Sequence, residues 1–399
     1  MRLLLLLVAA ISIAAAQTPA PPQQPVWQMQ DSGTTAGLRG IDSVDRTIAW
    51  ASGTGGTVLK TTDGGKHWLK CAIPDADKDG ATLDFRGIQA WDATTAIVMS
   101  SGPGEKSRLY KTTDGCKTWN LLYTNPDKDG FWDAFTFWDR KNGLLLGDPT
   151  ENKNPRGSFK AVDIGAGKQR LEKDDQPHLE FTVLFNEDED ATWSRQMYSF
   201  TPAPTAVARK GDSAAFAASN SALTVYGHTA WFGTGGKGGA RVFVGDNYGP
   251  LPDGLCDCFP MPPSRIWFTH SVATPIASGN DSSGIFSLNF RDPHHGIAAG
   301  GDYTKPNDTT DIAAWTADGG EHWLASTTPP HGYRSTVQYS ESLKLWITAG
   351  TNGSDLSRDD GKTWQPLDNG IWNALSFPFI VGPQGRIARL NPAAIPVAK

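Results

Sequence analysis

The sequence lacks any dense run of basic residues. Its 36 Lys and Arg are outnumbered by 42 Asp and Glu, and the formal charge at pH 7 is −6. A nucleic-acid-binding surface needs clustered cations to neutralise phosphates, so this composition argues against a nucleic-acid partner. Long hydrophobic runs are also missing beyond the first ten residues. We therefore expect a mature chain that does not span a membrane.

Uninterrupted helix-favouring stretches are missing too, because 43 glycines and 27 prolines recur throughout the 399 residues. This distribution excludes a coiled coil or a helical bundle. What the chain does have is 39% hydrophobic residues and 15 tryptophans. Such a chain can bury a large core, which excludes wholesale disorder.

The N-terminus has the pattern of an export signal. Arg2 precedes the apolar run Leu3–Ala10, and Ala14–Ala16 provides small residues before Gln17. We predict a signal peptide over residues 1–16 and a Pro-rich linker over residues 17–25. No cysteine stands at the cleavage point, so a lipid anchor is not indicated. The mature protein is expected to be secreted or periplasmic.

Cysteine is scarce, with four residues at positions 71, 116, 256 and 258. Cys71 and Cys116 lie beside equivalent turns of neighbouring repeats, so in an oxidising compartment they either pair or stay buried as free thiols. Cys256 and Cys258 are too close in sequence for an unstrained bridge, and only one histidine lies near them.

An eight-residue motif, Ser/Thr-x-Asp-x-Gly-x-Thr/His-Trp, occurs four times, and residues 186–193 are a degenerate copy. The Asp carboxylate of such a motif accepts backbone N–H groups across a tight turn, and the Trp opens the next strand and fills space between sheets. The structural residues assigned to these four turns are Asp63, Trp68, Asp114, Trp119, Asp318, Trp323, Asp359 and Trp364.

Short alternating strands separated by Gly-rich turns, four per unit of about 40 to 50 residues, predict an all-β fold built of propeller blades. Counting first strands gives seven, and Val26–Gln30 is an extra strand that completes the last sheet. Insertions are expected at Glu151–Gln176 and Asn247–Pro263. We therefore predict one monomeric, seven-bladed β-propeller over residues 26–399, with four-stranded antiparallel blades closed by the N-terminal strand.

The four turns resemble the Asp boxes, or bacterial neuraminidase repeats, of sialidases and related propellers. With the Arg-Gly-Ile blade starts at residues 39–41 and 86–88, the chain is more similar to the photosystem II stability/assembly factor family. The resemblance covers nearly all of residues 37–392. It implies a propeller whose Asp boxes are structural, and an assembly-factor-like role toward a client of a membrane complex.

First strands of a propeller line its channel, so aligned first-strand residues are candidate site residues. The alignment places Arg39, Arg86, Asp133, Asn220, Phe286, Arg334 and Asn373 at one position. Clustered arginines either bind an anion or acidic partner, or pair locally and plug the channel, and both interpretations stay open. Asp148, Asp302 and Tyr303 follow second strands and either join this face or serve turns.

Two functions follow from these residues. The preferred hypothesis is a non-enzymatic scaffold that holds a partner protein or anionic ligand through the arginine-lined face. The alternative is a secreted, sialidase-like glycoside hydrolase, with Arg39, Arg86 and Arg334 holding a carboxylate, Asp133 as acid, and Tyr303 or Tyr333 as nucleophile. That alternative lacks a Glu beside either Tyr and lacks the Phe/Tyr-Arg-Ile-Pro start of the sialidases.

Two acidic loops resemble the first half of a calcium loop. The residues concerned are Asp75, Asp77 and Asp79 in one loop, and Asp127 and Asp129 in the other. The glutamate expected at the twelfth loop position is absent from both, so acidic turns between blades are the other interpretation. No other cofactor is expected.

Overall fold

The computed structural model describes residues 24–152, 159–163, 169–173, 178–186, 193–195, 200–201, 207–208, 214–247 and 266–396. Several predictions from the sequence lie outside these residues. They are the signal peptide, residues 17–23 of the linker, Cys256 and Cys258, and most of the two insertions and of the degenerate motif.

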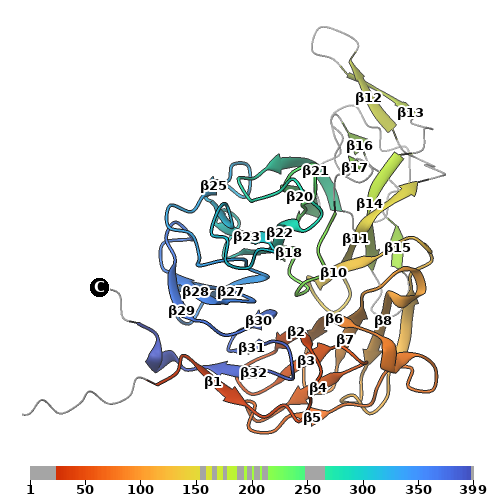
Figure 1. The fold of residues 1–399 in the computed structure, drawn as a ribbon. Coiled ribbons are helices and arrows are strands. Elements are labelled where there is room, and N and C mark those ends of the chain that lie inside the picture. Colours follow the sequence, from red (N-terminus) through yellow and green to blue (C-terminus); the bar gives the residue numbers. More distant parts are fainter. Residues whose placement is uncertain are drawn as a thin grey trace, which may run out of the picture.

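Seven antiparallel blades stand around a central channel in the described part of the chain, six of them four-stranded sheets and one a four-stranded path with a fifth strand attached (Figure 1). In blades one to six the strands follow chain order from the channel outward. The predicted seven-bladed propeller is confirmed.

Blades one, two, five and six are the regular blades, each made of four consecutive strands. Blade one has β2 (Leu38–Ser43), β3 (Ala49–Gly53), β4 (Val58–Thr61) and β5 (Leu69–Lys70). Blade two has β6 (Phe85–Ala90), β7 (Ala96–Ser100), β8 (Arg108–Thr112) and β9 (Asn120–Thr124). Blade five has β22 (Ser283–Phe290), β23 (Gly296–Asp302), β24 (Ala313–Thr316) and β25 (Leu324–Ala325). Blade six has β26 (Thr336–Ser340), β27 (Leu345–Gly350), β28 (Gly353–Ser357) and β29 (Gln365–Asp368).

Blades three and four carry additions. Blade three has β10 (Trp132–Phe137), β11 (Gly143–Asn152), β14 (His178–Asn186) and β15 (Trp193–Arg195), with β17 (Val207–Ala208) also pairing β14. A separate sheet joins β12 (Phe159–Asp163), β13 (Gln169–Lys173) and β16 (Phe200–Thr201). Blade four has β18 (Leu223–Tyr226), β19 (Thr229–Gly233), β20 (Arg241–Asn247) and β21 (Ile266–Ala273). The described helical residues form three short 3-10 turns, at Gly80–Thr82, Gly104–Lys106 and Pro392–Ala394.

Blade seven is closed by the opposite end of the chain. Its inner strands are β30 (Ala374–Ser376), β31 (Phe379–Val381) and β32 (Ile387–Leu390), and its outer strand is β1 (Trp27–Gln30). In Figure 1 the red β1 lies beside the blue β32, and the register pairs Trp27 with Leu390. The Trp27 indole also donates to Ser354 of blade six at 3.0 Å. The predicted closure by the N-terminal strand is therefore confirmed.

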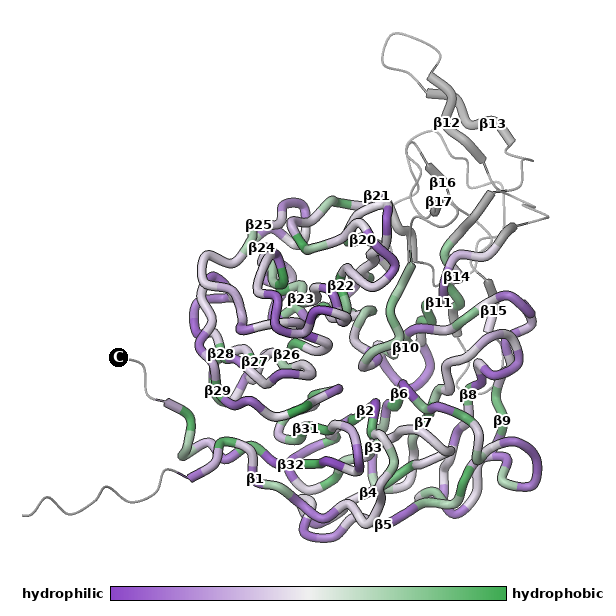
Figure 2. The backbone as a smooth tube through the Cα atoms, viewed as in Figure 1, coloured by the Kyte–Doolittle hydropathy of each residue, from purple (hydrophilic) through white to green (hydrophobic). Residues whose placement is uncertain are grey.

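The core lies between the faces of neighbouring blades. Second strands are buried along their whole length, as in β3, β7 and β27, because both faces of these strands are covered. Hydrophilic segments gather in turns at the rim (Figure 2). Several large side chains are almost fully buried, among them Trp50, Trp231 and Trp346.

The four Asp-containing turns, called the Asp turns below, share one hydrogen-bond pattern. In the turn of blade six, Asp359 accepts the backbone N–H of Thr363 at 3.0 Å and the hydroxyl of Ser357 at 2.8 Å. The Ser357 hydroxyl oxygen accepts the N–H of Gly361 at 2.9 Å. Equivalent bonds form around Asp63, Asp114 and Asp318.

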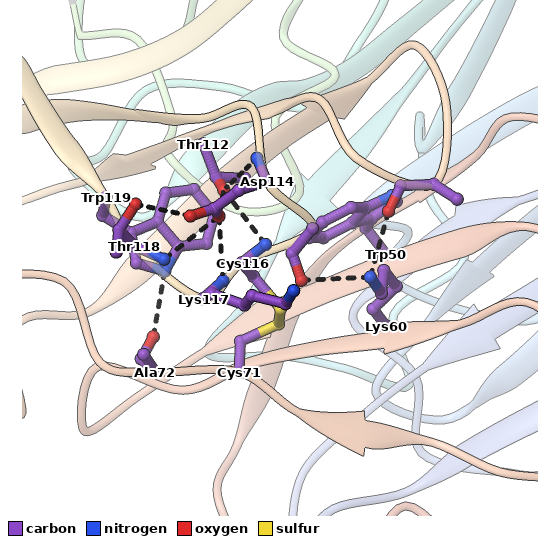
Figure 3. The surroundings of a disulfide bond; sticks show 12 residues. Trp50, Lys60, Cys71, Ala72, Thr112, Asp114, Cys116, Lys117, Thr118 and Trp119 are labelled. Carbon is purple, nitrogen blue, oxygen red and sulfur yellow. Dashed lines mark hydrogen bonds between the residues drawn. A yellow bond between two sulfur atoms is a disulfide. The ribbon is translucent and has the colours of Figure 1, made fainter.

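A disulfide joins blade one to blade two. Cys71 follows β5, and Cys116 lies in the Asp turn of blade two (Figure 3). Next to the bridge the Trp119 indole donates to the Ala72 carbonyl at 2.9 Å. Of the two possibilities that the sequence left open for these cysteines, the structure has the bridge.

A ring of side chains ties the first strands together inside the channel. Each blade contributes one residue to this channel ring: Asp42, Gln89, Thr136, Thr224, Asn289, Gln338 and Ser376. Five of them accept a backbone N–H from the next blade at 2.7 to 3.0 Å, as Gln338 does from Phe377. Among the described residues no corresponding bond forms at Thr136 or Thr224.

Candidate functional site

The channel ring shows which residues occupy equivalent positions in the first strands of the seven blades. Three positions before each ring member lie Arg39, Arg86, Asp133, Ser221, Phe286, Ser335 and Asn373. The predicted alignment is therefore corrected at two places, where Asn220 and Arg334 stand one residue too early. At Arg39, Arg86, Asp133 and Phe286 the strand register skips a residue. Such bulges redirect a side chain away from the ladder, here at the start of the first strands.

Arg334 is buried and does not face the channel. Its Nε donates to Asp355 at 2.8 Å, a terminal nitrogen also contacts Asp355, and another donates to the Tyr333 carbonyl at 2.7 Å. Arg334 and Asp355 are both fully buried, and His331 shares the carboxylate at 2.8 Å. For this arginine the local-pairing interpretation holds.

The segment before blade four closes one end of the channel. Residues 214–221, called the plug below, contact four blades around it. The Ala217 carbonyl accepts from Arg86 of blade two at 3.1 Å, and Asn220 accepts the N–H of Phe135 of blade three at 2.8 Å. The Ser219 hydroxyl donates to the Ser335 carbonyl beside blade six at 2.7 Å, and the Ser221 hydroxyl donates to Ser287 of blade five at 2.7 Å. The chain therefore seals its own channel at the end where the first strands begin.

Two arginines flank one carboxylate beside the plug. Arg86 Nε donates to Asp84 at 2.8 Å, while Arg39 Nε lies 3.8 Å from the other oxygen of the same carboxylate. That Arg39 nitrogen and that Asp84 oxygen are buried without a hydrogen-bond partner. The side chains of Arg39 and Arg86 keep 35% and 29% of their surface exposed. One carboxylate thus faces two guanidinium groups, which leaves donor capacity open to solvent.

Aromatic side chains form the other wall of this mouth. Phe286 stacks on Phe216 of the plug at 4.0 Å between ring centroids and meets Tyr333 edge-on at 4.9 Å. Tyr303 meets Phe286 at 6.1 Å and is 52% exposed. Burial raises the pKa of Tyr333, the charge of Tyr303 adds to the rise, and the charge of Arg39 opposes it. We call Arg39, Asp84, Arg86, Phe216, Phe286, Tyr303 and Tyr333 the mouth cluster.

Two further predicted carboxylates lie behind Arg86. Asp133 is 1% exposed, and its Oδ2 has no hydrogen-bond partner. Burial, and secondly the charge of Asp148, raises the pKa of Asp133 well above its ordinary value, while Arg86 opposes the rise. Burial also raises the pKa of Asp148 to about 6, although Asp148 accepts the Ala215 N–H of the plug at 3.1 Å. The structure thus brings Arg86, Asp133 and Asp148 together.

The remaining predicted residues serve local structure. Asp302 accepts from Ser282 and from Thr304, and these bonds outweigh burial and lower its pKa to about 2. The Asn373 side chain donates to the Leu38 carbonyl at 2.7 Å and joins blade seven to blade one. Only Tyr303, next to Asp302, belongs to the mouth cluster.

The first acidic loop pairs with cations of the chain itself. Asp79 contacts Arg108 at 2.6 Å and Lys106 at 2.7 Å, and Asp75 accepts from the Tyr110 hydroxyl at 3.0 Å. Asp77 and Asp129 are exposed, and Asp127 is half-buried. Across the described ranges no group of three or more His, Cys, Asp or Glu residues is arranged to hold a metal.

Sequence reasoning missed Asp84 and the plug. The Asp84-Phe85-Arg86 order carried a signal, because the residue two positions away on a strand lies on the same face. Phe216 carried no such signal in the sequence. Nothing in its sequence context shows that the connection to blade four turns back into the channel mouth.

This chain resembles known proteins in part of its sequence and in its fold. No family model matches it. Over 134 residues it is 25% identical to the photosystem II assembly lipoprotein Ycf48 of Synechococcus sp. (strain CC9902), a match covering 32% of this chain and 37% of that protein. The chain therefore matches a little over a third of the length of that relative. No helix among the described residues is both long and apolar enough to cross a membrane.

Two solved structures share the fold. YCF48 bound to D1 peptide superimposes with a TM-score of 0.54 at 15% identity, over 94% of this chain and 99% of that one. YCF48 from Cyanidioschyzon merolae gives a TM-score of 0.55 at 15% identity, over 92% of this chain and 99% of that one. The predicted resemblance to photosystem II assembly-factor propellers is confirmed: the chain is similar to Ycf48 in sequence over a third of its length and in fold over nearly all of it.

Proposed function

We propose that this chain is an exported, non-enzymatic propeller scaffold that binds an acidic segment of a partner protein at its mouth cluster. The observation that carries the proposal is the state of Arg39. None of its guanidinium nitrogens has a hydrogen-bond partner among the described residues, and the nearest carboxylate oxygen stands at 3.8 Å. A planar guanidinium with free donors is suited to bind a carboxylate through two parallel hydrogen bonds.

The surroundings of Arg39 suit an extended peptide. Arg86 adds a second cation that already shares Asp84, so an incoming carboxylate meets more positive charge than Asp84 neutralises. The exposed Tyr303 ring and its aromatic neighbours supply contact area at low cost in side-chain entropy. A solved propeller of the same fold contains a D1 peptide, which supports a peptide as the ligand class.

The structure gives no support to the hydrolase alternative. Arg334 is committed to Asp355, and Tyr333 is buried beneath Phe286. Within the described part of the chain, no glutamate is hydrogen-bonded to Tyr303 or Tyr333. The proposal therefore assigns no catalytic residue.

Binding to peptide arrays tests the proposal. The mature protein is titrated into immobilised peptides from proteins of the same host compartment, each paired with a copy whose Asp and Glu are replaced by Asn and Gln. Arg39→Ala combined with Arg86→Ala is expected to weaken binding of the acidic copies at least tenfold, since each lost charged contact contributes about 1.5–3 kcal/mol. The matched control is Arg46→Ala, an exposed arginine in the turn after β2, at the other end of the blade. Equal binding of acidic and amide copies, or equal loss in the control, would overturn the proposal.

A further inference from the structure

The channel is a blind well with a volume of about 220 Å³. The plug residues Ser219–Ser221 form its floor, and the channel ring forms its wall farther along the first strands. Six of the seven ring residues are partly exposed, so the well is open at the end of the propeller opposite the mouth cluster. This end carries the turns that follow first and third strands, because antiparallel strands alternate in direction.

Among the described residues that line the well, Asp42 is the single ionisable one. Its carboxylate accepts the Ala90 N–H at 2.7 Å, and no described cation pairs with it. Burial raises the pKa of Asp42 to about 6, since the charge has lost water without gaining a counterion. An unpaired carboxylate at a confined, water-accessible position favours the binding of a positively charged ligand.

The other ring atoms indicate what kind of cation fits. The side-chain oxygens of Gln89, Asn289, Gln338 and Ser376 already accept backbone N–H groups. A calcium ion needs six to eight oxygen ligands, commonly with several carboxylates among them, and this well offers one carboxylate beside the hydroxyls of Thr136, Thr224, Thr336, Ser219 and Ser221. An ammonium group has three N–H donors and needs few acceptors, so it matches this inventory better than a metal ion.

We propose that the well binds a primary ammonium group, with Asp42 as its counterion, supplied by a small alkylamine or by a lysine side chain inserted from a partner. Ile41, Ile88, Leu288 and Leu375 border the well, but their side chains are buried between the blades, so the surface that meets the ammonium group is formed mainly by the polar channel ring. This site lies at the opposite end of the channel from the mouth cluster, so it goes beyond the proposed function and is independent of it.

Titration with amines tests the site. n-Propylammonium chloride is titrated into the mature protein at constant ionic strength, with sodium chloride as the reference, and binding is followed by calorimetry and by the backbone amide resonance of Ala90. Saturable binding that moves this resonance is expected. Asp42→Asn keeps an oxygen for the Ala90 N–H but removes the charge, and is expected to weaken binding about tenfold or more.

Two comparisons make the result decisive. Glu341→Gln removes one negative charge from an exposed position in the turn after β26, at the same end of the propeller, and is expected to leave binding unchanged. Acetyl-Gly-Lys-Gly-amide is then compared with its norleucine analogue. Tighter binding of the lysine peptide than of free amine identifies a partner side chain as the source, and the reverse identifies a free amine. Absence of saturable binding, or equal binding by Asp42→Asn, would show a well filled with water only and overturn the proposal.

Discussion

Blades three and four differ from the other five in how they are held. In blades one, two, five and six an Asp turn precedes the outer strand, and blade seven is closed by β1. The channel-ring bonds run unbroken from blade five through seven to three, and the two that are missing flank blade four. Yet these two blades contribute the plug, Asp133 and Asp148 to the candidate site. The regular blades hold the ring together and supply most of the mouth cluster, while the connection into blade four adds Phe216 of the plug and blade three adds the two buried carboxylates behind it.

The largest expected contrast lies between two arginines that the sequence made look alike. Arg334→Ala leaves Asp355 as a buried charge without its partner and is expected to lower the free energy of unfolding by about 3–5 kcal/mol. Arg39→Ala removes a half-exposed side chain without hydrogen bonds and is expected to cost less than about 1 kcal/mol. Urea unfolding of both variants measures the contrast. Similar losses in the two would show that Arg39 is structural.

The disulfide strengthens the regular side of the ring. Replacing both Cys71 and Cys116 by Ser is expected to lower the free energy of unfolding by about 2–4 kcal/mol, because the bridge restricts the unfolded chain. Its sequence separation is 45 residues. Thermal unfolding with and without dithiothreitol checks this. The reductant is expected to destabilise the wild type and to leave the double variant unchanged, and no effect on the wild type would contradict the prediction.

The channel ring offers a finer test of the difference between the regular blades and blade four. Gln338→Leu leaves the Phe377 N–H without its acceptor and is expected to cost about 1–2 kcal/mol. Thr224→Val, at the equivalent position of blade four, removes a hydroxyl with no such bond and is expected to cost less than about 0.5 kcal/mol. Equal costs by chemical denaturation would show that the missing bond is not what distinguishes blade four.

The last prediction concerns Asp42 and depends on pH. Its folded-state pKa of about 6 lies above the ordinary value of 3.8, so the carboxylate lowers the stability of the fold progressively between about pH 4 and pH 6, and the full penalty applies above that range. Asp42→Asn removes that penalty and is expected to stabilise the protein by about 1–2 kcal/mol at pH 7, with allowance for partial exposure. Below about pH 4 both forms are neutral and the two stabilities converge. Melting curves at pH 4 and pH 7 check the sign, and a variant less stable at pH 7 would contradict it.

The fold was predictable because each blade repeats one local pattern. The Asp turns and the alternating strands recur, so the count of seven and the closure by β1 follow from the sequence. The site was predictable in part. Arg39, Arg86 and Asp133 were predicted because they share a strand position. The prediction for Arg334 was wrong, because a shift of one residue in register moves a side chain from the channel into the core. Asp355, which captures Arg334, lies 21 positions away, and no local signal links the two.

The pairing of β1 with β32 also sets when the protein finishes folding. Trp27 finds its sheet partner Leu390 only after almost the whole chain has been synthesised. Until then one outer strand has no neighbour and the last blade has no outer edge, so the ring closes late and through a contact of very high sequence separation.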